Sequence, residues 1–488
     1  MSEENGANST KRDSAEVLEY GGGPREWGAR RPVATAGQIS LEGMHGTIAV
    51  PHSNAGFWRH YAAYVGPALL VSVGYMDPGN WGTDLQGGAQ FKYDLLWVVA
   101  VASVMAIFMQ VVSARLGVVT GKDLAQFCRD HLPAWTRWPN WLCAEVAIGA
   151  CDLAEVLGSA VALNLMFHIP LLWAVILTGL DVLLLLALQG MGMRFIEALI
   201  LVLISTIGIC YYIEIFVLPQ THPSFLEMGR AMLLPGFRKP GMIYVAIGII
   251  GATVMPHNLY LHSALVQSRR FQQDNASIRK AIRFNTIDST VALTVAFFVN
   301  AAILVLAAVV FYGRDAVTLP SGQVVPFGDN ADWIRVAYLT LAPLLGVAAA
   351  SPLFAIALLA SGQSSTITGT LAGQVVMEGF MHWRIRPWMR RMITRTLAIM
   401  PAVLIIGLRG DSSVNDLLTL SQVVLALQLP FAMFPLLYFT SRRKHMGVYR
   451  LGWFLAVAGW GSAILITVMD VWGLPDSLKQ AWHVVAGG

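Results

Sequence analysis

The sequence predicts an all-α integral membrane protein with about eleven transmembrane helices, arranged as two inverted five-helix repeats and one additional helix. Only 13% of the 488 residues are charged and 56% are hydrophobic, whereas soluble domains carry roughly 25% charged residues. Apolar runs recur between Tyr61 and Trp472, and about 20 apolar residues suffice to cross a bilayer. Two of these runs are interrupted by proline and polar residues, which predicts the repeats.

The elements follow one another along the chain with few long polar stretches. Residues 1–55 are polar and glycine-rich, which predicts a disordered cytoplasmic tail. The segment 332–345 predicts an amphipathic helix on the membrane surface. The first repeat is expected over residues 56–217, the second over 241–440 and the additional helix over 450–472. The eleven spans are expected at 58–90, 94–115, 139–166, 169–189, 194–217, 241–268, 284–312, 345–378, 391–408, 414–440 and 450–472.

Lysine and arginine placement predicts the orientation, because cytoplasmic loops are enriched in these residues. The loops after spans 2, 6, 8 and 10 are basic, whereas those after spans 1, 7 and 9 each carry a single basic residue. The loop after span 5 fits this pattern worst. We therefore expect a multi-pass plasma-membrane protein, or an inner-membrane protein in a bacterium, with a cytoplasmic N-terminus and an outside C-terminus. The small net charge of +4 reflects this orientation and not a nucleic-acid partner.

The first interruption is the stretch MDPGNWGTD, Met76 to Asp84, within the first span. Pro78 lacks an amide hydrogen and disfavours helical geometry at Asp77. Backbone groups without helical hydrogen bonds are tolerated at membrane depth only where they are buried in protein or line a cavity. An ionised aspartate there costs about 3 kcal/mol, so Asp77 predicts a functional site with a cation as its partner. Asn80 adds an amide oxygen and is a candidate helix cap.

The second interruption is GATVMPHNLYLH, Gly251 to His262, within the sixth span. Pro256 frees carbonyl groups near Ala252, and Met255 supplies a thioether sulfur. Sulfur together with oxygen suits late first-row divalent metals, whereas Mg²⁺ and Ca²⁺ prefer oxygen alone. The first and sixth spans enter from opposite sides, so the two breaks predict inverted repeats with a metal site near the midplane.

Two carboxylates in the third span, within CDLAEVLG, predict a proton relay. Asp152 and Glu155 are three residues apart and share a helix face. A structural ion pair with an arginine is the alternative, and the two interpretations overlap because a relay acid can also pair with arginine. The candidate partners are Arg390, Arg391 and Arg395 at the start of the ninth span.

The remaining polar candidates stay open at this stage. His257 and His262 lie about 140° apart on a helix, so they do not form a two-histidine metal face. Each is either a satisfied polar residue or part of a proton path. Gln422 and Gln428 are lone amides in the tenth span, and the sequence does not choose which of them reaches the metal site.

These stretches resemble the Nramp family of proton-coupled divalent metal ion transporters over about residues 56–470. The resemblance is carried by DPGN and TDLQGGAQ in the first span, DLAEVLG in the third, ATVMPHNLYLHSALVQSR in the sixth and SGQSSTITGTLAGQVVMEGF in the eighth. It implies a LeuT-type fold and uptake of Mn²⁺, Fe²⁺ or similar ions, including Cd²⁺ and Co²⁺, with protons. It assigns metal binding to Asp77, Asn80, the Ala252 carbonyl, Met255 and Gln422. It places Asp152, Glu155, His257 and the arginines of the ninth span on the proton route.

The expected function is therefore secondary active import of divalent transition-metal ions by alternating access. The sequence carries no Walker motif, so an ion gradient is the expected energy source and no enzymatic activity is expected. We expect no cofactor, no nucleic-acid partner and no obligate protein partner beside the lipid bilayer. An amino-acid transporter of the same fold and a divalent-metal channel remain alternatives. The half-helix amides of such an amino-acid transporter would receive a carboxylate, which Asp77 would repel.

Overall fold

The structure is a computed structural model, and it describes residues 46, 48–51, 56–181, 193–213, 223–272, 274–318, 324–327, 333–345, 348, 350–410 and 414–486. The predicted tail lies almost entirely outside the described residues. Within it, β1 (Ile48–Ala49) pairs in parallel with β2 (Arg269–Arg270). The first described residues are thus tied to the chain that follows the sixth span.

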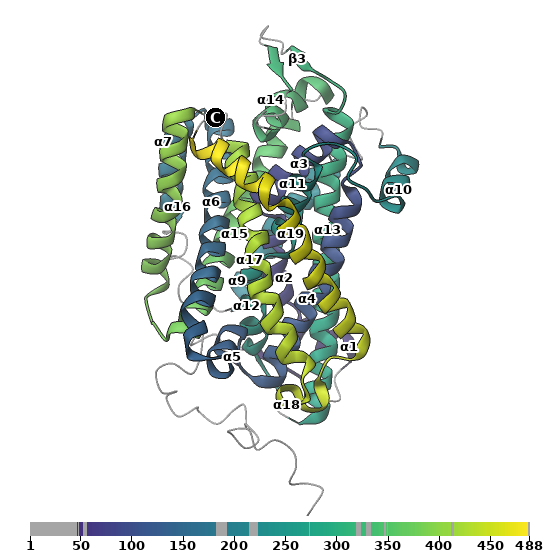
Figure 1. The fold of residues 1–488 in the computed structure, drawn as a ribbon, viewed down its shortest axis with the longest axis vertical. Helices are drawn as coiled ribbons and strands as arrows, with labels where there is room; N and C mark the ends of the chain where they lie inside the picture. The colour runs from purple at the N-terminus through teal and green to yellow at the C-terminus, as the bar shows by residue number, and fades with distance from the viewer. Residues whose placement is uncertain are drawn as a thin grey trace, which may run out of the picture.

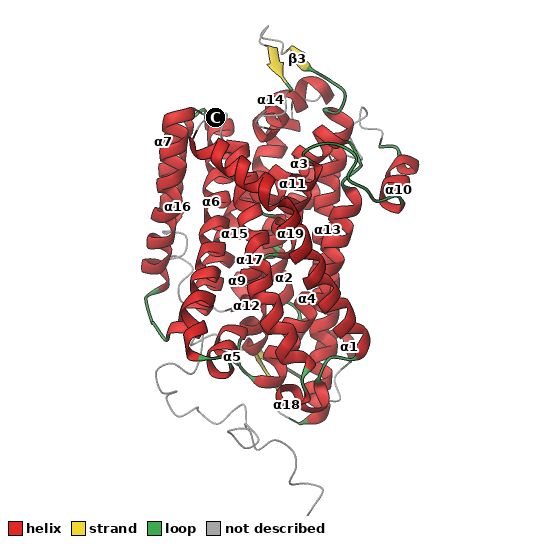
Figure 2. Ribbon diagram, in the orientation of Figure 1, coloured by secondary structure: helices red, strands yellow, loops and turns green. Residues whose placement is uncertain are grey.

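Long helices run side by side along one axis and make up nearly all of the described chain (Figures 1 and 2). Seven helical segments among the described residues are long and apolar enough to cross a membrane. The helices of the uninterrupted spans are α4 (Leu96–Thr120), α6 (Arg137–Phe167), α7 (Leu171–Leu177) with η3 (Thr178–Leu180), α9 (Met193–Tyr212), α13 (Asn275–Val310), α15 (Ala350–Met381), α16 (Pro387–Arg409), α17 (Val414–Ser441) and α19 (Trp453–Ala486). The predicted all-α membrane fold is confirmed.

The two interrupted spans are broken where the prolines predict. The first span consists of α1 (Phe57–Tyr64), α2 (Pro67–Ser72), η1 (Gly74–Met76) and α3 (Pro78–Phe91), and the sixth of α11 (Met242–Val254) and α12 (Pro256–Leu265). A further break at Gly66, where φ is 133°, was not predicted. Only glycine adopts such a φ readily, so Gly66 allows the turn between α1 and α2.

Several helix ends differ from the prediction. Helix α13 begins nine residues before the expected start, because the Asp274 side chain accepts hydrogen bonds from Ala276 N (3.0 Å) and Ser277 N (3.2 Å) and caps the helix. Helix α19 continues to Ala486 instead of ending at residue 472. The fourth expected span is described only as far as residue 181, and its remainder lies outside the described residues.

Short elements cover the ends of the bundle. The predicted helix before the eighth span is α14 (Trp333–Leu345), and it packs against α15 and α3. The other short elements are α5 (Leu124–His131), η2 (Ala134–Thr136), α10 (Phe225–Leu233), η5 (Val266–Ser268), the antiparallel pair β3 (Ala316–Thr318) and β4 (Val324–Pro326), α18 (Arg443–Met446) and η7 (Gly447–Tyr449).

Helices α6 and α15 lie close together because small residues of α15 face α6. A Cβ atom on Gly362 would overlap the Ser159 hydroxyl, and one on Gly369 would lie 3.0 Å from Glu155 Oε1. Small residues permit such close helix packing within membranes. The carboxylates of α6 therefore lie directly against α15.

The two ends of the bundle carry different elements. Helices α1, α5 and α18 lie at one end, and α10, β3 and the C-terminus lie at the other (Figure 1). The start of the first span and the end of the chain are thus on opposite sides, as an odd number of crossings requires. Which end faces the cytoplasm stays a prediction.

Candidate functional site

The break in the first span leaves one carboxylate oxygen of Asp77 without a partner. Asp77 has an extended backbone and caps α3, with its Oδ1 accepting from Asn80 N at 2.9 Å and from Asn80 Nδ2 at 2.8 Å. Its Oδ2 is buried and accepts no hydrogen bond from the described residues. An unpaired buried carboxylate oxygen is costly unless a cation or proton joins it.

The break in the sixth span meets this carboxylate through Asn80. The Asn80 side-chain nitrogen lies 3.0 Å from the Ala252 carbonyl oxygen and 3.4 Å from the Gly74 carbonyl oxygen, in addition to its contact with Asp77. Three oxygen atoms from the two broken helices therefore converge on one amide group. If the amide were turned over, Asn80 would present its own oxygen to the same centre.

Met255 brings a thioether sulfur from the break of the sixth span to the first span near Gly74. It links α11 to α12 with a φ of 37°, a conformation that costs a non-glycine residue about 1–3 kcal/mol and is concentrated at functional sites. Its sulfur lies 3.4 Å from Asn258 Nδ2. A Cβ atom on Gly74 would lie 3.1 Å from the same sulfur, so the Met255 side chain packs against η1 of the first span.

The structure brings Gln422 of α17 to both breaks. A Cβ atom on Gly79 in the first turn of α3 would overlap the Gln422 side chain, and one on Gly251 would overlap the Gln422 carbonyl oxygen. The Gln422 Nε2 donates to Ser421 Oγ at 2.8 Å, and its Oε1 has no partner among the described residues. Of the two glutamines left open by the sequence, Gln428 is only partly buried.

The donor set at the breaks consists of one carboxylate, amides, a carbonyl and a thioether. Among the described residues, no three side chains of His, Cys, Asp or Glu are grouped to hold a metal. Asp77, Asn80, Ala252, Met255 and Gln422 are all fully buried. This mixture of hard oxygen and one soft sulfur suits a late first-row divalent ion, and solvent does not reach it in this conformation.

A buried ion-pair cluster joins α6, η3 and α16. Arg391 pairs with Asp152 and lies 2.9 Å from Glu155 Oε2 and 3.3 Å from Asp181 Oδ2. Arg395 pairs with Asp181 and lies 3.6 Å from Glu155 Oε2. Three carboxylates thus face two guanidinium groups, so one bound proton would balance the charge of the cluster.

Hydroxyl groups of α15 complete the surroundings of Glu155. Ser365 Oγ donates to Glu155 Oε1 at 2.8 Å, and Thr366 Oγ1 donates to Oε2 at 3.2 Å. Helix α15 also contacts the first break, because Ser361 Oγ donates to the Met76 carbonyl at 2.5 Å. One helix therefore contacts both the metal-site candidate and the ion-pair cluster.

Arg390 lies apart from this cluster. Its guanidinium group pairs with Glu145, with an Nη2 to Oε2 distance of 2.8 Å. The structure thus separates Arg390 from Arg391 and Arg395, which were grouped with it in the sequence. Arg390 and Glu145 form their own charge-balanced pair.

The two histidines of α12 have different surroundings. His262 Nδ1 lies 2.9 Å from Gln110 Oε1, and Gln110 Nε2 donates to the Tyr75 hydroxyl at 2.7 Å, which links α12 to η1 through α4. His257 Nδ1 is buried and has no partner among the described residues. His262 is partly satisfied, because its Nε2 is also buried without a partner among the described residues. Each histidine therefore keeps one ring nitrogen available for a proton.

Two residues near the site were missed by the sequence reasoning. Asn300 of α13 donates to the Tyr75 carbonyl at 2.8 Å and to Asn80 Oδ1 at 3.2 Å. Asp181 enters the ion-pair cluster from the fourth span. Both are single polar residues within apolar runs, the signal that marks functional residues in membrane helices.

The fold and these buried polar centres define a multi-pass helical membrane protein with a polar site between two broken helices. Residues 68–475 match the family model described as Nramp, natural resistance-associated macrophage protein-like. The chain belongs to the Nramp family, and the predicted resemblance is confirmed.

Relatives and solved structures are similar over most of their lengths. The chain is 51% identical to a divalent metal cation transporter MntH of Nostoc sp. over 90% of this chain and 96% of the relative. It is 46% identical to the protein of that name in Listeria monocytogenes, over 89% and 94%. A manganese transporter of Eremococcus coleocola in complex with an aromatic bis-isothiourea compound superposes with a TM-score of 0.79 at 37% identity, over 90% of this chain and 91% of that one. These relatives are named as transporters, in agreement with the expectation that the chain is no enzyme.

Proposed function

We propose that this protein is a secondary active transporter that imports Mn²⁺, Fe²⁺ or similar divalent transition-metal ions together with protons. The observation that carries the proposal is the unpartnered, buried Oδ2 of Asp77. The other oxygen of this carboxylate shares the Asn80 side-chain nitrogen with the Ala252 carbonyl. A divalent cation would satisfy the unpartnered oxygen. The relatives named as divalent metal cation transporters and the manganese transporter structure support the same class of substrate.

In this proposal the metal displaces the Asn80 amide nitrogen from the three oxygens that surround it. Asp77, the Ala252 carbonyl and Met255 would then bind the ion, with Asn80 turned to offer its oxygen and Gln422 adding a second amide oxygen. Cd²⁺ and Co²⁺ fit the same donors. No cofactor takes part, because the metal is the transported substrate.

The ion-pair cluster is the proposed route for the coupled proton. With Asp152, Glu155 and Asp181 ionised, its two arginines leave one negative charge uncompensated. His257 follows Met255 by two residues in the same broken span, and its unpartnered Nδ1 is the proposed proton acceptor near the metal site. Proton binding at Glu155 would rearrange its bonds to Arg391, Ser365 and Thr366.

Alternating access requires contacts that can break and re-form, and hydrogen bonds and ion pairs of this kind hold α1 at its end of the bundle. Helix α1 is held at its end by Arg269, whose Nε donates to the Ala63 carbonyl at 3.2 Å, and by Arg194, whose Nη1 donates to the Val65 carbonyl at 3.0 Å. Glu197 pairs with both arginines, at 2.9 Å from Arg194 and 2.8 Å from Arg269. Breaking these contacts would release α1 and open the buried site toward that end.

The end that carries α1 and the basic loops is proposed to face the cytoplasm. The N-terminus would then be cytoplasmic and the C-terminus outside, in the plasma membrane or a bacterial inner membrane. Residues 56–217 and 241–440 are proposed as the two inverted repeats. Metal ions, protons and lipid are the proposed partners.

Uptake by purified protein in proteoliposomes with an acidic exterior tests this function. We expect saturable Mn²⁺ entry that accelerates with the pH gradient and acidifies the interior, with Fe²⁺, Cd²⁺ and Co²⁺ competing better than Ca²⁺ or Mg²⁺. Flux that does not saturate and ignores the pH gradient would indicate a channel. Uptake of amino acids without metal transport would indicate an amino-acid transporter.

A further inference from the structure

Helix α10 (Phe225–Leu233) lies outside the membrane spans and yet carries an exposed apolar face. It stands between the fifth and sixth spans, and in Figure 1 it lies beside the bundle near the end that carries β3 and the C-terminus. Phe225 is 71% exposed and Leu233 is 81% exposed, and Leu226 and Met232 are exposed as well. A cluster of large exposed apolar side chains marks an interaction surface.

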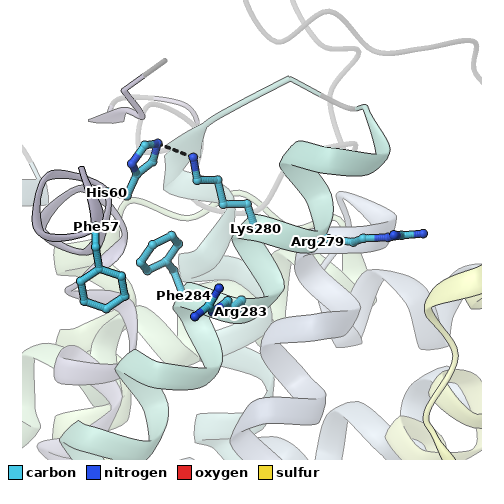
Figure 3. A pocket seen from close by; sticks show the side chains of 6 residues that line it. All are labelled: Phe57, His60, Arg279, Lys280, Arg283 and Phe284. Atoms are coloured by element: carbon cyan, nitrogen blue, oxygen red, sulfur yellow. Dashed lines mark hydrogen bonds between the residues drawn. The ribbon is translucent and has the colours of Figure 1, made fainter. Parts of the chain in front are cut away.

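The short helix at the opposite end of the bundle, α1, shows how such a face can be covered by protein. The ring of Phe57 in α1 lies 5.4 Å from the ring of Phe284 in α13, and His60 Nε2 lies 2.7 Å from Lys280 Nζ (Figure 3). One neighbouring helix thus contacts both an apolar and a polar side chain of α1. From the described part of the chain, the exposed apolar side chains of α10 receive no comparable cover.

The side chains of α10 point in four directions around the helix axis, because successive residues of a helix are about 100° apart. Each direction is occupied by one pair of residues: Phe225 and Met232, Leu226 and Leu233, Glu227 and Arg230, and Met228 and Ala231. The pair Met228 and Ala231 packs against the core of the bundle. The leucine pair therefore points away from the bundle, and the charged pair points opposite to Phe225 and Met232.

The charged pair faces the loop that joins the first and second spans. Glu227 forms an ion pair with Lys92 at 2.5 Å, and Glu227 and Arg230 line a cavity of about 290 Å³ together with the loop residues 92–94. A loop between two spans lies at the water-facing end of the bundle. The charged pair of α10 therefore points toward water, and the opposite pair, Phe225 and Met232, points toward the membrane interior.

Aromatic residues place α10 at the level of the lipid headgroups. The ring of Phe237, which follows α10, lies 5.4 Å from Trp97 at the start of α4 and 6.2 Å from Trp472 of α19, which is exposed. Tryptophan is enriched at the membrane–water interface. Helix α10 itself packs against α4. The helix and the chain that follows it thus lie where this end of the bundle leaves the membrane.

We propose that α10 lies flat in the membrane interface, with Phe225 and Met232 inserted among the acyl chains of phospholipids and the charged pair in water. Amphipathic helices of this kind bury their apolar face about 5–10 Å into the boundary between headgroups and acyl chains. The leucine pair would contact the same boundary at the side. A second copy of this chain is the alternative occupant, and the orientation of Phe225 and Met232 toward the membrane interior favours lipid.

The anchored helix would connect the two broken spans at the end of the bundle away from α1. Through Glu227 it is paired with Lys92, which ends α3, and through residues 234–241 it is joined to α11. These two half-helices carry Asn80 and Ala252. Membrane binding of α10 does not rest on the proposed function, whereas its consequence for the metal site does.

The depth of spin labels on the purified full-length protein in lipid nanodiscs tests the proposal. The test variants are Phe225→Cys and Met232→Cys, and the matched control is Arg230→Cys on the opposite side of the same helix. Phe298→Cys, an exposed position midway along α13, supplies a reference within the acyl chains. Wild-type protein treated in the same way supplies the background of the native cysteines, of which only Cys143 is not buried.

We expect collisions with oxygen and with a water-soluble nickel complex to place both test labels about 5–10 Å below the lipid phosphates, and the Arg230→Cys label above them. The Phe298→Cys label should lie about 15 Å deep, in the middle of the hydrocarbon core. Test and control labels at the same depth above the phosphates would overturn the interfacial helix. Test labels shielded from both oxygen and nickel would show that protein covers the face, which would overturn lipid as the occupant.

A phospholipid with a photoreactive diazirine in its acyl chain repeats the test on the wild type, without any substitution. Mass spectrometry would locate the labelled residues after illumination. We expect label on the apolar face of α10, at Phe225, Leu226, Met232 or Leu233, as well as on α13. Label on α13 and none on α10 would likewise overturn the proposal.

Discussion

The Asn80 side-chain nitrogen lies 3.0 Å from the Ala252 carbonyl oxygen, so the amide of the first broken span contacts the break of the sixth directly. The same nitrogen lies 2.8 Å from Asp77 Oδ1. Segments 172 residues apart in the sequence thus share one polar centre. A change at either break is therefore expected to alter metal binding at the other.

Replacing the sulfur should change selectivity. Met255→Ala leaves room for a water oxygen, which favours hard ions over soft ones. We expect Mn²⁺ transport to persist and the ratio of Cd²⁺ to Ca²⁺ affinity to fall roughly tenfold, the scale of ligand-sphere changes in metal sites. Competition within one preparation measures this ratio independently of expression. Met433→Ala, a buried methionine of α17, is the control; a ratio unchanged in Met255→Ala would mean that Met255 only packs.

Removing one titratable group of the proposed proton route should reduce proton movement without weakening metal binding. Glu155→Gln keeps the shape of the side chain but cannot gain and release a proton, and His257→Ala removes the buried ring nitrogen. We expect metal-driven acidification of proteoliposomes to fall about tenfold in each variant, because positioned proton-transfer groups contribute at least this much. The Mn²⁺ affinity should change little.

Asp470→Asn is the control for these two variants. Asp470 is a buried carboxylate of α19, outside the ion-pair cluster. Its replacement should leave acidification unchanged. Wild-type proton flux in both Glu155→Gln and His257→Ala would rule out the relay.

Close packing of α6 on the first break should make one glycine sensitive. A Cβ atom on Gly158 would overlap the Pro78 ring, next to Asp77, whereas one on Gly149 in the same helix meets nothing within 4 Å. Gly158→Ala should destabilise by about 1–3 kcal/mol through overpacking. Gly149→Ala should stabilise by roughly 0.5–1 kcal/mol, because alanine favours the helix. Thermal unfolding in detergent measures both, and similar melting temperatures would contradict the packing.

Local chemistry made the two breaks predictable from sequence. Pro78 and Pro256 each stand beside polar or sulfur-bearing residues, and this combination marks where the helix ends. Proline alone does not, because Pro430 and Pro435 lie inside α17. The residue pattern alone did not choose Gln422 over Gln428, because the choice depends on how α17 is rotated against α3; only the family resemblance favoured Gln422. The place of Asp181 in the ion-pair cluster was not predicted. A single acidic residue in a leucine-rich run did not interrupt the predicted span, so it was not singled out.

The separation of Arg390 from Arg391 follows from helix geometry. Adjacent residues on a helix point about 100° apart, whereas residues four apart share a face. Arg391 and Arg395 therefore reach the same carboxylates, while Arg390 reaches Glu145. Sequence proximity grouped the three arginines, and only the position of α16 against α6 divides them.

Calorimetric titration of Mn²⁺ into the purified protein tests the central claim, that Asp77 is the anionic ligand of the transported metal. Asp77→Ala is compared with Asp84→Ala, which removes another buried carboxylate from the same helix α3. We predict that Asp77→Ala remains folded and binds Mn²⁺ about 100-fold more weakly or not at all, while Asp84→Ala keeps the wild-type affinity. Wild-type Mn²⁺ affinity in folded Asp77→Ala would contradict the assignment of the metal site to the two breaks.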